Sequence, residues 1–206
     1  MTVANAIVYV VDDDESVRKA TARLMRSAGS QVETFETARE FLDRRRPTGF
    51  GCLILDLAMP GVSGMELQKE LAELDVDLPI VFMTGTGDIP TSVEAMKQGA
   101  VDFLPKPVDN ERLLETVRSA IDQHTQARQQ SFREDAFRKR LKNLTKREHE
   151  VMLLVITGLR NKEIANRLGI TETTVKVHRG RVMEKTHVNS LAELVLLCDR
   201  VGCTLD

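Results

Sequence analysis

Short apolar runs alternate with amphipathic stretches along the front half of the chain. Runs of β-branched and apolar residues predict five strands, over residues 7–11, 32–35, 52–55, 80–84 and 102–104. The stretches between these strands carry helix signals. A strand that alternates with a helix five times is typical of an α/β fold, a doubly wound parallel sheet of (βα)5 form with helices on both faces.

Helix-capping motifs mark the starts of several of the intervening helices. Ser16 begins an amphipathic stretch that ends at Gly29, a residue type common at helix C-termini. The segments TARE (Thr37–Glu40) and SGME (Ser63–Glu66) both match the S/T-x-x-E capping box. These local signals place helices between the predicted strands.

One long helix and four short helices are predicted in the rest of the chain. Residues 109–141 contain neither Gly nor Pro, which indicates a long final helix of the front half that continues as a linker. The capping box TKRE begins the first short helix at Thr145, and the others begin at Asn161, Thr171 and Ser190. The segment NKEIANRLGITETTVKVH has the helix, glycine-containing turn and helix of a helix-turn-helix. We therefore expect three parts, at residues 1–122, 123–141 and 142–206.

Charge is unevenly distributed along the chain. The net charge is −2, but residues 138–206 carry 14 Lys and Arg against 8 Asp and Glu, whereas residues 1–137 carry 15 against 23. An acidic front half and a basic back half indicate two modules with different partners. Nucleic acid is the expected partner of the basic module.

The composition predicts a cytoplasmic protein with enough apolar residues to form buried hydrophobic cores. Apolar residues make up 42% of the chain and charged residues 29%. No apolar run reaches the length of a membrane span, and Asp12 interrupts the first hydrophobic run, so we expect neither membrane association nor a signal peptide. The three cysteines are odd in number and show no CxxC spacing, which indicates reduced thiols.

Polar side chains follow four of the predicted strands at the point where each strand ends. The first strand runs into Asp12 and Asp13, the third into Asp56 and the fourth into Thr84, and Lys106 follows the fifth. Because ligands of such sheets bind beyond the carboxyl ends of the strands, we expect these five side chains in one shallow pocket. Two carboxylates roughly 4 Å apart repel by about 4 kcal/mol at an effective dielectric near 20, so the acidic residues need a compensating interaction.

Together these motifs resemble a known family. The front half, with its acidic strand ends and following lysine, resembles the receiver domain of two-component response regulators. The back half is similar to the LuxR-type helix-turn-helix. Because both signatures occur in the expected order, the chain as a whole resembles the NarL/FixJ family of transcriptional regulators. The resemblance implies a flavodoxin-like (CheY-like) receiver, a linker helix and an all-α, four-helix DNA-binding domain.

The resemblance implies a phosphoacceptor and a metal site in the front half. Asp56 is expected to be the nucleophile that takes a phosphoryl group from a phosphohistidine on a sensor histidine kinase. Asp12, Asp13, Asp56 and the backbone carbonyl of Ala58 are expected to bind Mg²⁺. A hard divalent cation prefers oxygen ligands and would offset the repulsion among the carboxylates.

Three further receiver residues are implied in the response to phosphorylation. Lys106 is expected to pair with the phosphate oxygens, and its bond to Pro107 is cis in the family. Thr84 is expected to turn its hydroxyl toward the phosphate, which opens space for Phe103 to rotate inward. Phosphorylation would then favour one of two packings of the face around the fifth strand.

The second helix of the helix-turn-helix is expected to contact DNA. Lys176 and Val177 match positions that commonly touch bases, and the basic residues nearby suit phosphate contacts. Gly180 stands where a longer polar residue is usual, which costs about 1 kcal/mol of helix stability and either removes a base contact or lets the backbone approach DNA closely. Thr186 replaces a usual leucine and is expected to pack less well. The full set of expected DNA contacts is Lys162, Thr173, Thr174, Lys176, Val177, Arg179, Arg181 and Lys185.

The function implied by the resemblance is that of a DNA-binding transcriptional regulator rather than an enzyme, with autodephosphorylation at most. Phosphorylation of Asp56 is expected to drive homodimerisation and binding to adjacent DNA half-sites. The dimer is expected to use either the face around the fifth strand, with Phe103 and the helix over residues 90–98, or the linker helix over residues 123–141.

Two other functions fit parts of the sequence. The run DDDES loosely matches the D-x-D-x-T/V loop of haloacid-dehalogenase-type phosphohydrolases, with Asp12 as nucleophile and Asp14 as acid/base. Ser16 stands in place of the usual Thr or Val, however, and this interpretation leaves the basic back half unexplained. The other alternative is a DNA-binding protein that acts independently of phosphorylation, although every expected pocket residue is present.

Overall fold

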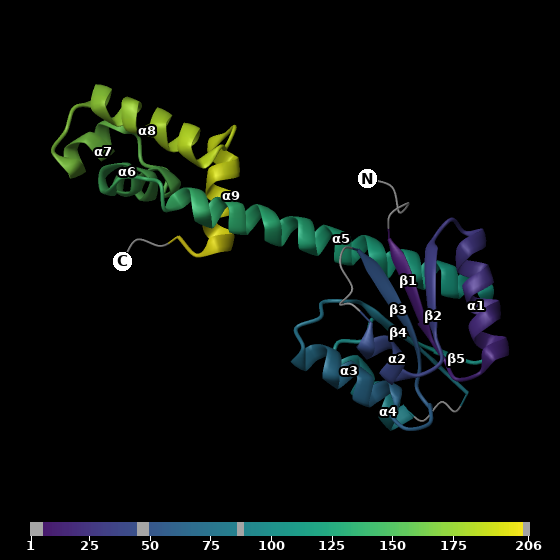
Figure 1. Cartoon of the computed structure of the whole chain (residues 1–206). Helices are drawn as coiled ribbons and strands as arrows, with labels where there is room; N and C mark the ends of the chain where they lie inside the picture. The colour runs from purple at the N-terminus through teal and green to yellow at the C-terminus, as the bar shows by residue number, and fades with distance from the viewer. Residues whose placement is uncertain (1–5, 45–49, 86–88, 204–206) are drawn as a thin grey trace. The chain divides into compact units, whose positions relative to one another are not determined.

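A computed structural model of the chain describes residues 6–44, 50–85 and 89–203, with the side chains of residues 89–91 excepted. The chain divides into two compact units, Met1–Ala127 and Arg128–Asp206. Each unit has a hydrophobic core of its own, and Figure 1 labels the helices and strands of both units.

Five parallel strands form the sheet of the first unit. The strands are β1 (Ile7–Val11), β2 (Gln31–Phe35), β3 (Gly51–Asp56), β4 (Ile80–Thr84) and β5 (Asp102–Pro105). Their spatial order is β2-β1-β3-β4-β5, and every neighbouring pair is parallel. The predicted doubly wound α/β fold is confirmed, and each predicted strand differs from the observed one by at most one residue at either end.

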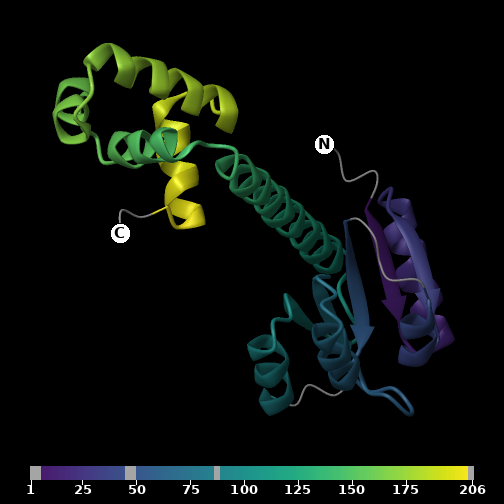
Figure 2. The same cartoon turned by 60° about the vertical axis from the view of Figure 1, so that its left-hand side comes forward.

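Helices cover both faces of this sheet because both faces are apolar. All six residues of the central strand β3 are buried. The helices are α1 (Glu15–Ser27), α2 (Ala38–Asp43), α3 (Gly64–Glu73), α4 (Ile89–Lys97) and α5 (Asn110–Leu141). In Figures 1 and 2, α2, α3 and α4 lie on one face of the sheet, and α1 and α5 lie on the other. On β1, Tyr9 and Val11 pack on the first face, whereas Val8 and Val10 pack on the second.

Side-chain caps fix where these helices begin. The hydroxyl of Thr37 accepts the backbone N–H of Glu40, and Ser63 and Glu66 form the complete capping box expected from the sequence. The first helix begins one residue earlier than predicted because Asp14 is its cap and accepts the N–H groups of Ser16 and Val17. A carboxylate at this place is favoured by the helix dipole.

A glycine lets α3 start directly beside the end of β3. A Cβ atom at Gly64 would lie 2.3 Å from the carbonyl oxygen of Asp56, far closer than atoms can approach. The N–H of Gly64 donates to the carbonyl oxygen of Leu57 at 3.0 Å. The close approach of two backbones thus requires glycine, and it holds the loop after Asp56 against the sheet.

The second unit contains the predicted helix-turn-helix. Its helices are α6 (Lys146–Ile156), α7 (Asn161–Leu168), α8 (Glu172–Thr186) and α9 (Leu191–Val201) (Figure 2). The final part of α5 adds the buried Phe137 to their core. The first helix of the motif ends at Gly169, which has a φ of 64° and makes the turn. The second begins where the hydroxyl of Thr171 accepts the N–H of Thr174 at 3.2 Å.

The threonine that departs from the family pattern is accommodated in this core. Thr186 is fully buried, and its hydroxyl donates to the carbonyl oxygen of Val182 at 2.6 Å. The carbonyl oxygen of Thr186 accepts a hydrogen bond from Arg140 of α5 at 3.4 Å. The buried hydroxyl is therefore satisfied within the helix, and the packing penalty expected for this residue stays a prediction.

Candidate functional site

Three carboxylates converge beyond the carboxyl ends of β1 and β3. Asp12 and Asp13 follow β1 directly, and Asp56 is the last residue of β3. One carboxylate oxygen from each of the three lies within 4.8 Å of the others. Asp12 is fully buried and Asp56 nearly so, whereas Asp13 is exposed, so Asp13 forms the solvent-facing side of the cluster.

Lys106 brings a cation to this cluster from the loop after β5. Its Nζ lies 2.7 Å from Oδ2 of Asp12 and 3.2 Å from Oδ2 of Asp56. Burial by itself would lower the pKa of Lys106, but the hydrogen bond and charge of Asp12, together with Asp56, outweigh burial and raise the pKa. Lys106 is therefore held in its charged form. The peptide bond from Lys106 to Pro107 is cis.

Asp56 presents an unsatisfied oxygen to the pocket. Its Oδ1 is buried and has no hydrogen-bond partner among the residues described. Burial raises the pKa of Asp56 and the charge of Asp12 adds to the rise, while Lys106 and the backbone N–H of Ala58 oppose it. An unpartnered buried polar atom costs about 1–3 kcal/mol, so a cation or an electrophile placed at this oxygen would be stabilised.

The donor set fits Mg²⁺. This hard cation binds through one or two carboxylates plus waters, and the unpartnered Oδ1 of Asp56 and the exposed Asp13 offer such oxygens. The carboxylate of Asp12 is already oriented, because its Oδ1 accepts the N–H of Asp14 at 3.0 Å and its Oδ2 accepts from Lys106. Ala58 lies in the exposed turn after Asp56, and metal binding by its carbonyl stays a prediction.

Thr84 and Phe103 lie on the two strands beyond β3. Thr84 ends β4 and is buried, and its carbonyl oxygen accepts the backbone N–H of Lys106 at 2.6 Å. Phe103 is partly buried on β5 and pairs in register with Phe82 on β4, with 6.2 Å between the ring centroids. This backbone hydrogen bond ties Thr84 to the segment that carries Lys106. The switch role of Thr84 and Phe103 stays a prediction.

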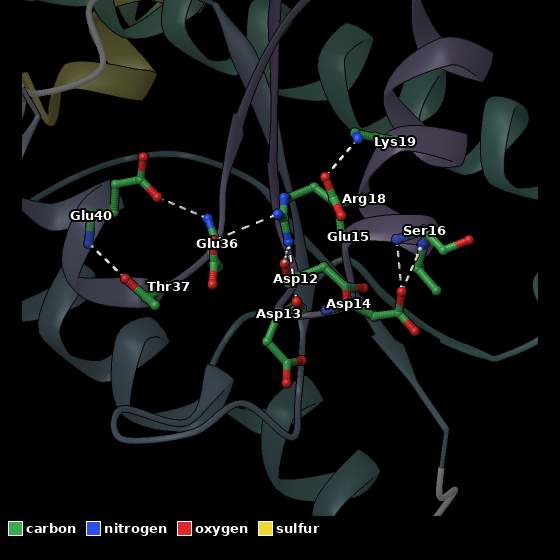
Figure 3. Close-up of polar contacts among 11 residues, drawn as sticks. Asp12, Asp13, Asp14, Glu15, Ser16, Arg18, Lys19, Glu36, Thr37 and Glu40 are labelled. Atoms are coloured by element: carbon green, nitrogen blue, oxygen red, sulfur yellow. Dashed lines mark hydrogen bonds and ion pairs between the residues drawn. The ribbon is translucent and has the colours of Figure 1, made fainter.

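One residue near the cluster was not singled out from the sequence. Arg18 of α1 donates from Nη1 to the carbonyl oxygens of Asp12 at 2.6 Å and Asp13 at 3.2 Å, and its Nη2 lies 3.8 Å from Oε2 of Glu36 (Figure 3). A signal was available in the sequence. A cation close to a helix N-terminus opposes the helix dipole, so Arg18 requires acceptors nearby.

Several of the expected DNA contacts share one exposed face of α8. Val175, Val182 and Thr186 are buried on one side of this helix. The exposed residues recur at helical spacing on the opposite side, where Val177 is 48% exposed although it is apolar. This face contains Thr173, Lys176, Val177, Gly180 and Arg181.

The remaining expected DNA contacts are placed differently. Lys162 is exposed on α7, whereas Thr174 shares a hydrogen bond with the hydroxyl of Thr171 at 2.8 Å. Arg179 donates to the side-chain oxygen of Asn161 at 2.8 Å. Lys185 lies 2.6 Å from Oε2 of the buried Glu148, in an ion pair between α8 and α6. For these three residues of α8, contact with DNA stays a prediction that requires an exchange of partners.

A five-stranded receiver-type sheet with an acidic pocket, followed by a helix-turn-helix unit, defines the class of two-domain signalling regulators. Residues 8–118 match the response regulator receiver domain, and residues 142–198 match the luxR family of bacterial regulatory proteins. The chain belongs to the response regulator family and carries a luxR-type DNA-binding domain.

Relatives match this chain over nearly its whole length. Nodulation protein W of Bradyrhizobium diazoefficiens is 45% identical over 96% of this chain and 87% of its own length. The transcriptional regulatory protein FixJ of the same organism is 43% identical over 97% of each chain. Among solved structures, the response regulator StyR has a TM-score of 0.79 at 49% identity and covers 95% of this chain and 98% of its own.

These relatives establish the general function. The chain is a response regulator of transcription, as the resemblance predicted, and its family consists of transcription factors rather than of classical enzymes. The phosphohydrolase alternative is not favoured. Over residues 6–44, 50–85 and 89–203, no helix has the length and apolar character needed to cross a membrane.

Proposed function

We propose that this response regulator takes a phosphoryl group onto Asp56 from the phosphohistidine of a sensor histidine kinase. The observation that carries the proposal is the convergence of Asp12, Asp13 and Asp56 with the ammonium group of Lys106. A carboxylate oxygen of Asp56 bonds to phosphorus as the bond between phosphorus and the histidine nitrogen breaks. That nitrogen keeps the electron pair of the broken bond and takes up a proton, and the product is an acyl phosphate on Asp56.

The pocket residues stabilise the charge that moves onto Asp56. Asp12, Asp13, Asp56 and the carbonyl of Ala58 would hold Mg²⁺, which when bound neutralises charge on the phosphoryl oxygens. Lys106 pairs with those oxygens in place of its contact with Asp56. Because Asp13 faces solvent, water also reaches this side of the pocket, and slow autodephosphorylation is the only hydrolysis that we assign to the chain.

The acyl phosphate then acts on the strands beyond β3. The hydroxyl of Thr84 turns toward the new phosphate, and Phe103 rotates into the space that it leaves. A shift between two packings from 1:99 to 99:1 requires about 5.5 kcal/mol of differential interaction, which several charge-assisted hydrogen bonds to one phosphate can supply.

Phosphorylation drives homodimerisation through the face formed by α4 and β5. On α4, the apolar side chains of Val93 and Met96 are 47% and 45% exposed, which supports a partner-binding role for this face. The linker part of α5 offers one corresponding feature, Phe132, which is 61% exposed. A Val93→Glu variant should remain monomeric with a phosphate mimic, whereas Phe132→Glu should still dimerise. The opposite result would assign the dimer to the linker helix.

The dimer places two helix-turn-helix units on adjacent half-sites of double-stranded DNA. The exposed face of α8 enters the major groove, where Lys176 and Val177 contact bases, with Thr173 and Thr174 beside them. The basic residues around this face contact phosphates and set the salt dependence of binding. They are Lys162, Arg179, Arg181 and Lys185.

The phosphoacceptor is tested by labelling the full chain with a small phosphodonor and Mg²⁺, followed by chemical trapping and mapping of the acyl phosphate. We expect modification at Asp56, none in Asp56→Asn, and full modification in Asp122→Asn, which alters an exposed aspartate on α5. Modification at Asp12 instead would support the phosphohydrolase alternative.

The coupling to DNA is tested by sedimentation and DNA binding with and without beryllofluoride and Mg²⁺. With beryllofluoride and Mg²⁺, the wild-type chain should dimerise and bind DNA more tightly. Asp56→Asn should show neither change when the same two ligands are added. Equal DNA affinity of both proteins under all conditions would show that DNA binding is independent of phosphorylation.

A further inference from the structure

Arg18 links the backbone of the acidic loop, residues 12–14 between β1 and α1, to the loop after β2 that contains Glu36. Its Nη1 donates to two consecutive carbonyl oxygens, those of Asp12 at 2.6 Å and Asp13 at 3.2 Å. Its Nη2 lies 3.8 Å from the carboxylate of Glu36, just after β2, and the side chain of Arg18 is only 14% exposed. In Figure 3 the guanidinium group lies between Glu36 and the acidic loop, and the carboxylate of Asp13 points away from it.

The anchor for this link is itself fixed by the fold. The backbone N–H of Arg18 donates to the carbonyl oxygen of Asp14 at 2.9 Å, and the side chain of Asp14 caps the same helix. On the other side, the N–H of Glu36 donates to the carboxylate of Glu40 on α2 at 2.9 Å. The guanidinium group thus bridges two segments that are each held by hydrogen bonds of their own, so the position of this planar group is defined.

The two carbonyl bonds constrain where the carboxylates can point. Because both carbonyl oxygens are held toward α1, the side chains of Asp12 and Asp13 are left to project toward the pocket. The carboxylate of Asp12 reaches Lys106, and an oxygen from each aspartate lies within 4.8 Å of one from Asp56. Among the residues that the structure describes, no side chain other than that of Arg18 donates to the carbonyl oxygens of these two adjacent aspartates, whose carboxylates repel each other.

We propose that Arg18 is a positioning residue for the divalent-cation site, acting through the backbone carbonyls of Asp12 and Asp13. This inference rests on the proposed function, because it concerns the same acidic pocket. Arg18 contacts neither the phosphoryl group nor the cation. Its role is to keep the carboxylates of Asp12 and Asp13 in the positions from which both can bind the cation. Partners of metal ligands typically change metal affinity or activity by about 10–100-fold when they are replaced.

The direction in which Mg²⁺ affinity changes when Arg18 is replaced distinguishes a positioning role from a purely electrostatic effect of its charge. A guanidinium group near a cation site repels the incoming cation, so loss of its charge alone would strengthen Mg²⁺ binding. Loss of the positioning bonds would weaken Mg²⁺ binding, because Asp12 and Asp13 would no longer be held in place. The two explanations therefore predict opposite changes in the same dissociation constant.

The test measures Mg²⁺ affinity of the full chain by calorimetry, and Mn²⁺ affinity by electron paramagnetic resonance, at fixed ionic strength. The variants are Arg18→Met and Arg18→Lys. The matched control is Arg23→Met, which removes the same charge from an exposed position on the same helix. Thermal unfolding with a chelator checks that each variant is folded, and Arg18→Lys serves if Arg18→Met does not fold.

We expect about 10-fold weaker binding in Arg18→Met, a smaller but clear loss in Arg18→Lys, and a change below about two-fold in Arg23→Met. Lysine keeps the charge but cannot bridge two carbonyl oxygens and Glu36 at once. Unchanged or tighter binding in Arg18→Met, or wild-type affinity in Arg18→Lys, would overturn the inference while the wild-type chain still binds the ion. Absence of binding and of phosphodonor labelling in the wild-type chain would instead overturn the proposed function.

Discussion

The ammonium group of Lys106 lies 2.7 Å from the carboxylate of Asp12, the fully buried acid that follows β1. Its distance to the carboxylate of Asp56 is longer, at 3.2 Å. The residue expected to hold the phosphate is therefore bound most closely to an expected metal ligand. Before a cation enters, Lys106 neutralises the buried carboxylate that would otherwise be unpaired.

Lys106→Met should separate metal binding from the response to phosphate. The variant loses the cation that competes for Asp12, so we expect Mg²⁺ affinity to be equal or higher, while beryllofluoride no longer induces dimerisation. Without metal, the variant should be less stable by about 3 kcal/mol, because a buried charge loses its partner. Calorimetry, sedimentation and chemical unfolding measure these effects.

The control for this prediction is Lys69→Met, which changes an exposed lysine on α3. It should leave all three measurements close to those of the wild-type chain. A Lys106→Met variant that still dimerises with beryllofluoride would contradict the phosphate-binding role of this lysine.

Asp56→Asn should stabilise the metal-free chain. Burial raises the pKa of Asp56, so at neutral pH this ionised carboxyl group opposes folding, and its removal is expected to add about 1 kcal/mol. The wild-type chain regains this free energy of unfolding as the pH falls through the raised pKa of Asp56, because the folded state favours the protonated carboxyl group. The variant should therefore show the largest gain at neutral pH.

Thermal unfolding with a chelator, at neutral pH and at mildly acidic pH, measures the difference between wild-type chain and Asp56→Asn. The exposed Asp122→Asn provides the baseline for loss of one carboxylate. If Asp56→Asn were less stable than the wild-type chain at neutral pH, the buried carboxylate would have to be better compensated than its unpartnered Oδ1 indicates.

Glu148→Gln should destabilise the second unit in a pH-dependent manner. The hydrogen bond from Lys185 and the backbone N–H of Thr145 lower the pKa of Glu148 from 4.5 to about 2. The ionised carboxylate thus contributes stability above about pH 4.5, and the contribution is lost as the pH falls toward 2. The difference between wild-type chain and variant should be largest near pH 7 and should shrink below pH 4.5.

Urea unfolding followed by amide NMR signals of α6 to α9 measures this difference for the second unit alone. Glu184→Gln, which changes an exposed carboxylate on α8, should show no comparable pH dependence. A constant difference between wild-type chain and Glu148→Gln from neutral pH to pH 3 would refute the assigned role of the ion pair with Lys185.

Gly180→Ala should stabilise α8 by about 1 kcal/mol. Glycine in a helix interior loses more backbone entropy than alanine, and a Cβ at this exposed position meets nothing within 4 Å. Urea unfolding of the variant measures the gain, and Ala20→Gly at an exposed position of α1 should destabilise the first unit by a similar amount. DNA titration of Gly180→Ala separates the two interpretations of Gly180, because weaker binding would indicate close approach of the backbone to DNA.

Local signals explain why the elements of this fold were predictable from sequence. Apolar runs located the five strands, and the capping residues Ser63 and Thr145 begin helices where the S/T-x-x-E pattern predicted. Alternation of strands and helices then implied that all carboxyl ends of the strands lie at one edge, which brought Asp12, Asp56 and Lys106 together.

Contacts between distant side chains were not predictable in the same way. The place of Arg18 near a helix N-terminus indicated that it needs acceptors, but it did not identify them as the backbone carbonyl oxygens of Asp12 and Asp13. The sequence pattern also did not reveal that Lys185, expected to contact DNA, is paired with a buried carboxylate on another helix. Both contacts depend on how helices pack.

The sequence by itself determined the order of strands and helices, the caps that start them and the residues at each strand end, since these depend on neighbours within a few positions. Only the tertiary structure decided which charged groups pair directly and at what distance. Lys106 reaches Asp12 across 94 positions of the chain, and Glu148 reaches Lys185 across 37. Such pairings follow from packing geometry, in which the burial of apolar faces fixes the backbone and the charged groups then bind whatever lies within reach.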